Sequence, residues 1–430
     1  MAEHRTAAHV SQPDGGAGRI ASIDIVRGFA ILWVILYHLW SDQKYPHIMT
    51  TGDTLQALAD RLRDGHPYAI LGAVTDAFLR LGFLGVPLFM TLSGLSLTMS
   101  AMRRPLTPRG TPAFMYRRFR RVMIPYWFGF VYAVVFALGM ALVQWQRHDG
   151  HPFSWFVRHG DVPLTGGQLF AGGLLVPRYW SNDWLFAPEG SLWFVLLIVQ
   201  YYLLFPFLLA LLRRAGPLPF VAAALAVTLL SLDRVLSVDG DLVQATSWVM
   251  ILAPFRIFEF ALGMVGGYLL MTRPVALWSF LRHPAGAGAL MLCGVTLFVL
   301  GNLVDPRETG HRVIFQTPAI ALGMSLLFLP VVAKAPGRLE VWAPGRLLAW
   351  VGVISYTVLI VNEPLRSVTH TMTIENARLG WQVLWVGALY MPITLIVARP
   401  LAVLLGLVER GSAQEAALPA AATAAGSVPT

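Results

Sequence analysis

Apolar stretches of about twenty residues recur along the whole chain, and this recurrence constrains the fold more than any single motif. An α-helix needs roughly 20 predominantly apolar residues to cross about 30 Å of hydrocarbon. The stretches long enough to do so lie at 20–42, 77–101, 119–144, 191–212, 217–232, 247–271, 284–303, 313–333, 347–366 and 382–407. The sequence therefore predicts an all-α, polytopic helical membrane protein with about ten transmembrane helices.

The composition supports this class. Hydrophobic residues make up 56% of the 430 residues and charged residues only 13%, against roughly 25% charged residues in soluble proteins. Residues 1–19 are polar and contain no apolar core of a signal peptide, so we expect a cytoplasmic N-terminal tail. Residues 20–409 form the expected transmembrane domain, in which any chemistry should lie. The Ala-rich segment 410–430 is expected to be a disordered tail.

Basic residues outnumber acidic ones, and the formal net charge is +9. Such a surplus is compatible with binding to nucleic acid, but its distribution argues against it. If the N-terminus lies in the cytoplasm, the inner segments collect the arginines, with seven of them in 103–121, and the outer segments collect the acids. This is the positive-inside distribution of membrane proteins. We therefore expect an integral protein of a bacterial inner (cell) membrane with both termini cytoplasmic, and no nucleic-acid partner.

Ionisable groups lie inside the first apolar stretch, where lipid tolerates them poorly. Asp24 and Arg27 stand near one end of this stretch and His38 near the other. A charged side chain at the centre of a spanning helix costs about 3 kcal/mol even on lenient scales, so such groups point to a functional site. Arg27 and His38 are eleven residues apart, which is about three helical turns, or about 16 Å along one face. That face could hold a long ligand with a charged end.

Cysteine and histidine patterns argue against a metal centre or a disulfide. Cys293 is the single cysteine, so no disulfide within the chain and no thiolate metal site can form. The histidines show no HExxH or other ligand spacing. We expect no bound metal.

Five segments resemble, in the same order, motifs of the acyltransferase 3 family of integral membrane acyltransferases. In the first of them, the Asp, Arg-Gly and His of the family match Asp24, Arg27, Gly28 and His38. The segments are SIDIVRGFAILWVILYH at 22–38, FLGVPLFMTLSGLSLT at 83–98, YRRFRRVMIPYW at 116–127, EGSLWFVLLIVQYYLLFP at 189–206 and RIFEFALGM at 256–264. They extend over most of the apolar part of the chain.

The resemblance implies an enzyme that transfers an acyl group, usually acetyl, from a cytoplasmic acyl-coenzyme A (acyl-CoA) to a hydroxyl group. Its acceptors would be glycans, lipid-linked sugars or other envelope and secondary-metabolite compounds, so O-acetylation of a polysaccharide is one expected reaction. Acyl-CoA would be a co-substrate, and we expect no permanently bound cofactor. The surrounding partner is the lipid bilayer.

His38 is the candidate catalytic base, because an acceptor hydroxyl needs a positioned base near neutral pH; the alternative is a neutral histidine bonded to a neighbouring helix. Arg118 and Arg121 lie at i and i+3, hence on one helix face. They are candidate ligands for the phosphates of acyl-CoA, which suit the planar guanidinium group. The alternative is a cluster that contacts anionic lipid. Arg27 either pairs structurally with Asp24 or contacts the donor while Asp24 steadies it.

Arg256 and Glu259 form a second i, i+3 pair inside an apolar stretch. For this pair we favour a structural role, in which the two charges compensate each other and fix the orientation of the helix. Gly263 and Gly267 follow with GxxxG spacing, which favours close approach of two helices in a membrane.

Four further residues have supporting roles in the hypothesis. Ser93 precedes Gly94 and is best explained by close packing, since no nucleophile elbow surrounds it. Trp193 could stack on a sugar, although aromatic residues near the ends of spans are commonly interface anchors. In ISYTVLIVNEP at 354–364, Asn362 replaces the His of a similar family segment, beside Glu363. An asparagine cannot act as a base here, so it retains only a positioning role through hydrogen bonds.

A different class of function is also compatible with the intramembrane Arg, His and Glu residues. In a polytopic transporter or channel, such groups would line a path for a substrate or for protons. The ordered motifs favour the enzyme. Because neither an activated cysteine nor an elbow serine is present, we expect direct attack by the acceptor in a ternary complex and not a covalent acyl-enzyme.

Overall fold

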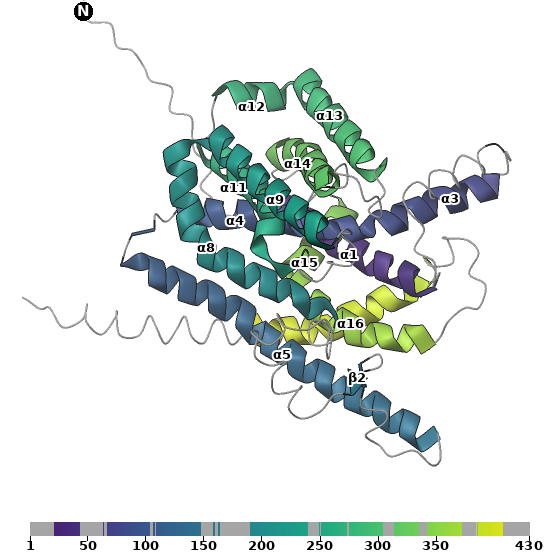
Figure 1. Ribbon diagram of the computed structural model, residues 1–430. Helices are drawn as coiled ribbons and strands as arrows, with labels where there is room; N and C mark the ends of the chain where they lie inside the picture. The colour runs from purple at the N-terminus through teal and green to yellow at the C-terminus, as the bar shows by residue number, and fades with distance from the viewer. Residues whose placement is uncertain are drawn as a thin grey trace, which may run out of the picture.

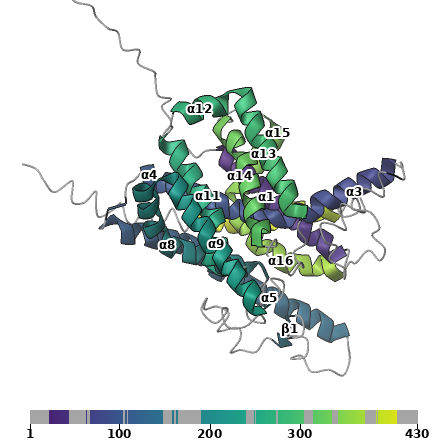
Figure 2. The same ribbon diagram turned by 45° about the horizontal axis from the view of Figure 1, so that its top comes forward.

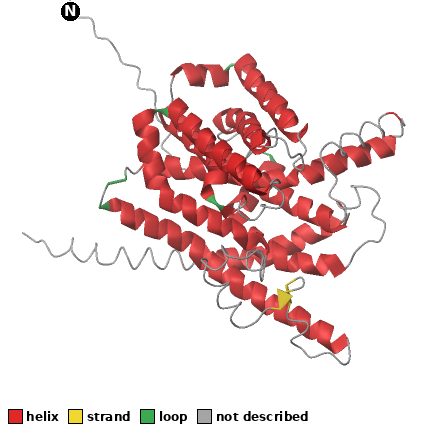
Figure 3. Cartoon of the chain, viewed as in Figure 1, coloured by secondary structure: helices red, strands yellow, loops and turns green. Residues whose placement is uncertain are grey.

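The computed structural model describes the larger part of the chain. The described residues are 21–43, 63, 67–103, 106–107, 109–147, 158–159, 162–163, 190–239, 249, 251–272, 275–303, 314–334, 342–371, 384 and 386–406. The predicted tails, 1–19 and 410–430, lie outside them. The described part is almost entirely helical, apart from a two-residue antiparallel pair, β1 (Arg158–His159) with β2 (Val162–Pro163) (Figure 3).

The helices follow one another along the chain as the apolar stretches do. They are α1 (Ala21–Gln43), α3 (Pro67–Arg80), the 3-10 turn η1 (Leu81–Leu84), α4 (Gly85–Arg103), α5 (Gly110–Arg147), the 3-10 turn η4 (Gly190–Leu192), α8 (Trp193–Ala215), α9 (Pro217–Asp239), α11 (Ala253–Thr272), α12 (Val275–Arg282), α13 (Pro284–Leu303), α14 (Gln316–Lys334), α15 (Ala343–Val353), α16 (Ser355–Thr371) and a last helix over Val386–Gly406. Figure 1 shows α5 along one side of the bundle and α12 to α14 on the other, and Figure 2 shows the same separation.

The predicted all-α membrane fold is confirmed, with two refinements to the ten predicted spans. Within the described residues, eight helices are long and apolar enough to cross a membrane. The eighth and ninth stretches differ: the apolar part of α14, Gln316–Val332, is shorter, and the stretch predicted at 347–366 is a bent pair, α15 and α16, with 79° between its halves.

The bend between α15 and α16 determines where α16 lies. It occurs at Ile354, whose φ and ψ of −98° and 9° depart from the helical values, while the Ser355 hydroxyl donates to the carbonyl of Gly352 at 2.9 Å. After the bend, α16 packs against α5, where the Tyr356 hydroxyl donates to the carbonyl of Val122 at 3.0 Å. A straight span could not contact both α1 and α5 in this way.

Glycines allow the closest helix contacts of the fold. A Cβ atom on Gly28 of α1 would lie 1.9 Å from the carbonyl oxygen of Leu348 in α15, and one on Gly352 would lie 1.8 Å from the carbonyl oxygen of Asp24. Small residues let two backbones approach in this way inside a membrane. Consequently the backbone of α1 beside Asp24 is held directly against α15.

The predicted close approach at the GxxxG pair is confirmed between α4 and α11. A Cβ atom on Gly263 would lie 1.8 Å from the Thr91 carbonyl oxygen, and one on Gly267 would lie 2.5 Å from the Leu95 carbonyl oxygen. From the other side, Gly94 faces the carbonyl oxygen of Phe260 at 2.2 Å from an added Cβ. This contact fixes α4, which carries one wall of the cavity described below.

We predict that Gly263→Ala destabilises the fold, because the added methyl group meets main-chain atoms of α4 and neither helix can move without disturbing the rest. Overpacking of this kind costs about 1–3 kcal/mol. The measurement is the midpoint of thermal unfolding in detergent. Gly139→Ala in α5 is the matched control, since a Cβ atom there has nothing within 4 Å. Equal midpoints for the two variants would contradict the proposed contact.

Candidate functional site

A cavity of about 870 Å³ lies among α1, α4, α5, α8 and α16. It brings together eight of the residues that the sequence singled out, although these come from five helices. The eight residues are Asp24, Arg27, His38, Ser93, Arg118, Arg121, Trp193 and Glu363. The remaining three, Arg256, Glu259 and Asn362, do not line the cavity.

One face of α1 forms a wall of this cavity. The lining residues Arg27, Ile31, Val34 and His38 recur every third or fourth position, the spacing of a single helix face. The face is polar at Arg27 and at His38 and apolar between them. The predicted common face of Arg27 and His38 is therefore present.

Arg27 is held by two neighbours on the cavity wall. Its Nη1 lies 3.3 Å from Oδ1 of Asp24, and its Nη2 donates to the hydroxyl of Ser96 at 2.6 Å. Asp24 is buried, whereas Arg27 keeps about a quarter of its side chain exposed, at 27%. The Asp24–Arg27 pair, one of the two alternatives left open by the sequence, is thus formed, and Arg27 also lines the cavity.

Three arginines, Arg103, Arg118 and Arg121, line one end of the cavity, which we call the arginine end. Arg118 donates to the hydroxyl of Ser100 at 2.7 Å, and its guanidinium lies 5.4 Å from the ring centre of Phe114. Two contacts therefore hold Arg118 in place. The i, i+3 spacing placed Arg118 and Arg121 on one face, and both do line the cavity.

The other end of the cavity, the histidine end, is lined by His38, Gly190, Trp193, Glu363 and Arg366. Glu363 accepts a hydrogen bond from Nε of Arg366 at 3.1 Å and a second, short one from its Nη2. A Cβ atom on Gly190 would lie 3.0 Å from Oε1 of Glu363, so the start of η4 lies directly against the carboxylate of this ion pair.

Contacts along α16 establish that these are opposite ends. Tyr356 bonds to Val122, the residue after Arg121. Glu363 lies seven residues further along α16, hence about 10 Å from that level. The residue before Glu363 on α16 is Asn362, which contacts Tyr390 of the last helix. One turn before Tyr390, a Cβ atom on Gly387 would lie 3.0 Å from the side chain of Leu36 in α1. The far part of α16 is therefore level with the His38 part of α1.

Arg103 and Arg366 line the cavity but were missed in the sequence analysis. The signal for Arg366 was present, since it follows Glu363 at i+3, the same spacing as in Asp24 with Arg27 and in Arg256 with Glu259. Arg103 gave no such signal, because it was one of many arginines in a basic segment. Only the packing of α4 beside α5 distinguishes it.

Asn362 has a positioning contact of the kind expected from its side chain. It is 2% exposed, and the Tyr390 hydroxyl donates to its carbonyl oxygen at 2.6 Å and lies 3.0 Å from its Oδ1. This contact joins α16 to the last helix, immediately behind Glu363. Asn362 stands where the similar family segment has a histidine, and in this structure it packs against the last helix and does not line the cavity.

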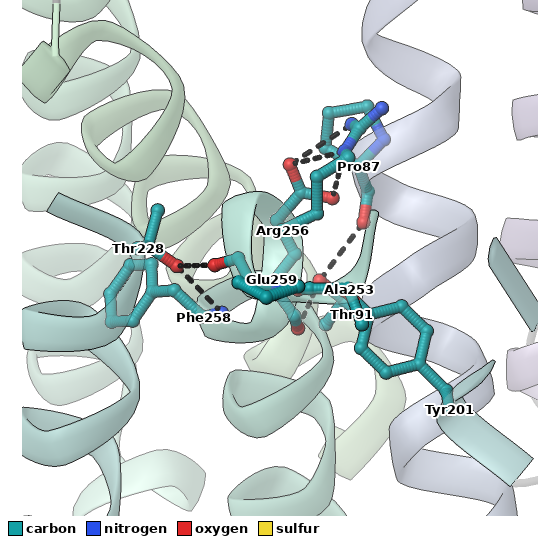
Figure 4. A network of polar contacts seen from close by, with 9 residues as sticks. Pro87, Thr91, Tyr201, Thr228, Ala253, Arg256, Phe258 and Glu259 are labelled. Atoms are coloured by element: carbon teal, nitrogen blue, oxygen red, sulfur yellow. Dashed lines mark hydrogen bonds and ion pairs between the residues drawn. The ribbon is translucent and has the colours of Figure 1, made fainter. Parts of the chain in front are cut away.

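Arg256 and Glu259 form a buried ion pair outside the cavity. Arg256 donates to the carboxylate at 2.9 and 3.2 Å, and the two side chains are 11% and 1% exposed. Figure 4 shows the surrounding polar contacts, in which Thr91 donates to the carbonyl oxygen of Glu259 and Tyr201 to that of Ala253. The pair itself lies within α11, and these main-chain contacts beside it join α11 to α4 and α8.

Comparison with known protein families gives one match that spans most of the chain. Residues 20–403 match the family model described as an acyltransferase domain, acyltransferase 3. The chain belongs to this family. The motif residues Asp24, Arg27 and His38 all line its cavity.

The name of one curated relative does not mention an acyltransferase. The chain is 28% identical over 205 residues to a protein named regulator of hypoxia-inducible factor 1 from Caenorhabditis elegans, a match that covers 46% of this chain and 36% of the relative. The chain thus spans only about a third of the length of that relative. No solved structure matches the chain.

We predict that Arg256→Ala lowers stability by about 3–5 kcal/mol, because it leaves the buried Glu259 carboxylate uncompensated. The double variant Arg256→Met with Glu259→Leu should recover most of this loss, since it removes both charges and retains apolar volume. Thermal unfolding in detergent measures both effects. Arg213→Ala, at an exposed position near the end of α8, is the control. A single variant as stable as this control would show that the ion pair is dispensable.

Proposed function

We propose that the protein is an integral membrane acyltransferase that moves an acyl group, in the simplest case acetyl, from acyl-CoA to a hydroxyl of a glycan, lipid-linked sugar or other envelope or secondary-metabolite acceptor. The observation that carries the proposal is that one cavity has three arginines at one end and His38 at the other. A donor with charged phosphates and a distant reactive carbon fits such a cavity. The two ends are suited to the two parts of that donor.

The phosphates of acyl-CoA would bind at the arginine end. Arginine is suited to phosphate because its planar fork donates two parallel hydrogen bonds. The bond from Arg118 to Ser100 leaves other N–H groups of its guanidinium to face the cavity, and Arg121 lies one turn further on the same helix face. Arg27, held by Asp24 and Ser96, would contact the donor between its phosphates and its thioester.

His38 would act as the base at the other end. The acceptor hydroxyl oxygen attacks the thioester carbonyl carbon, and His38 takes the hydroxyl proton as the new C–O bond forms. The C–S bond then breaks, and the coenzyme A thiolate takes up a proton as it leaves. A positioned base contributes typically 10²- to 10⁴-fold to such a reaction. Direct transfer in a ternary complex needs no nucleophile from the protein.

The proposed orientation places the arginine end toward the cytoplasm, where acyl-CoA is made. The basic segment 103–121 supports this orientation, since cytoplasmic segments collect Lys and Arg. The histidine end then lies toward the outer side of a bacterial inner membrane, and both termini lie in the cytoplasm. The acceptor would approach from the outer side.

The test of this function is release of coenzyme A thiol from acetyl-CoA by purified protein, with an extract of envelope glycans as acceptor. We predict acceptor-dependent release, and a fall of about 100-fold or more in His38→Ala, because the base is lost. His283→Ala, outside the cavity, is the matched control and should keep wild-type turnover. If His38→Ala retains more than about a tenth of the activity, well short of this expected loss, His38 is not the base.

We predict that Arg118→Ala raises the apparent KM for acetyl-CoA about tenfold or more, since a hydrogen bond to a charged group is worth about 1.5–3 kcal/mol. Arg118→Lys should recover only part of the loss, because a point charge cannot replace a planar fork. The neighbouring exposed Arg117, replaced by Ala, is the control. Equal KM values in Arg118→Ala and Arg117→Ala would show that Arg118 does not bind the donor phosphates, and would favour the alternative that the arginine cluster contacts anionic lipid.

A further inference from the structure

The character of the cavity wall changes in the middle. On α1, the apolar residues Ile31 and Val34 separate Arg27 from His38. On α16, Leu359 separates Tyr356, level with the arginine end, from Glu363 at the histidine end. Two helices from distant parts of the sequence therefore place apolar side chains in the same middle section.

Two phenylalanines from other helices also belong to the cavity wall. Phe89 on α4 and Phe194 on α8 both line the cavity, and their ring centres lie 6.2 Å apart with an edge-to-face angle of 70°. Phe89 is one turn from Ser93 on α4. Phe194 follows Trp193 of the histidine end, and their rings also meet edge to face at 5.9 Å. We call Ile31, Val34, Phe89, Phe194 and Leu359 the apolar band.

The apolar band has no role in binding phosphates or in moving a proton. Its side chains offer no hydrogen bond to the polar arm of a donor, but they match the apolar surface of an acyl chain, of which each buried methylene favours binding. The band also lies directly before His38, at the level where a thioester must end if its carbonyl is to meet the acceptor. Edge-to-face aromatic pairs resist separation, so the Phe89–Phe194 contact limits the depth available.

We infer that the apolar band is the subsite for the acyl chain and that Phe89 and Phe194 together determine the chain length accepted. This inference rests on the proposed transfer from acyl-CoA and adds the class of acyl group to it. With both rings in place, the space beside the thioester suits a short chain such as acetyl. Removal of one ring opens space for additional methylene groups without altering either charged end.

The experiment compares initial rates with acetyl-CoA and butanoyl-CoA in the wild-type protein, Phe194→Ala and Phe89→Leu. The expected result is a rise of about tenfold in the butanoyl-to-acetyl ratio of kcat/KM for Phe194→Ala, the gain from seating two further methylene groups. A smaller rise is expected for Phe89→Leu, which keeps more of the side-chain volume and guards against a variant that fails to fold. Phe207→Ala, 76% exposed on the same helix, is the matched control and should leave the ratio unchanged.

The outcomes separate the two proposals. If the wild-type protein transfers acetyl but neither cavity variant changes the ratio relative to Phe207→Ala, the band is not the acyl subsite, while the proposed function stands. A uniform rise in KM for both donors also contradicts the acyl subsite, because a general loss of packing does not discriminate chain length. If the wild-type protein releases no coenzyme A from either donor with any acceptor fraction, the proposed function fails and this inference falls with it.

Discussion

A charge in an apolar environment must be compensated locally, and much of this structure depends on that constraint. Three ion pairs of the described residues, Asp24 with Arg27, Arg256 with Glu259 and Glu363 with Arg366, each join positions i and i+3 of one helix. A pair within one helix is already formed when that helix enters the membrane, so neither charge has to wait for a partner helix. Desolvation of two charges together is costly, but desolvation of one alone is worse.

The same pairing has different consequences according to the face on which it lies. Arg256 and Glu259 are buried away from the cavity and compensate each other within α11. Asp24 with Arg27 and Glu363 with Arg366 instead border the cavity, where a compensated arginine can still donate further hydrogen bonds to a ligand. Backbone contacts at Gly28 and Gly352 hold α1 against α15. The bend between α15 and α16 then places the third pair, Glu363 with Arg366, at the histidine end of the cavity.

The sequence was sufficient for features with a local cause. Apolar length predicted the spans, and i, i+3 spacing predicted both the Asp24–Arg27 pair and the common face of Arg118 and Arg121. It was not sufficient for features that depend on distant segments. The 79° bend splits one apolar stretch that looks continuous, and Arg366 reaches the cavity only because of that bend. Spacing alone also could not distinguish Arg256, which does not line the cavity, from Arg27, which does.

The arrangement of charge gives the cavity a direction. Five arginines and two carboxylates are among its lining residues. Each carboxylate is paired with one arginine, Asp24 with Arg27 and Glu363 with Arg366, whereas Arg118 and Arg121 at the arginine end add positive charge to the wall. In a low-dielectric surrounding this positive charge attracts anions strongly. The histidine end, with its charges compensated, offers hydrogen-bond donors and acceptors without a net attraction for either sign. A cavity that binds an anion at one end and a neutral polar group at the other is better suited to transfer between two unlike molecules than to passage of one.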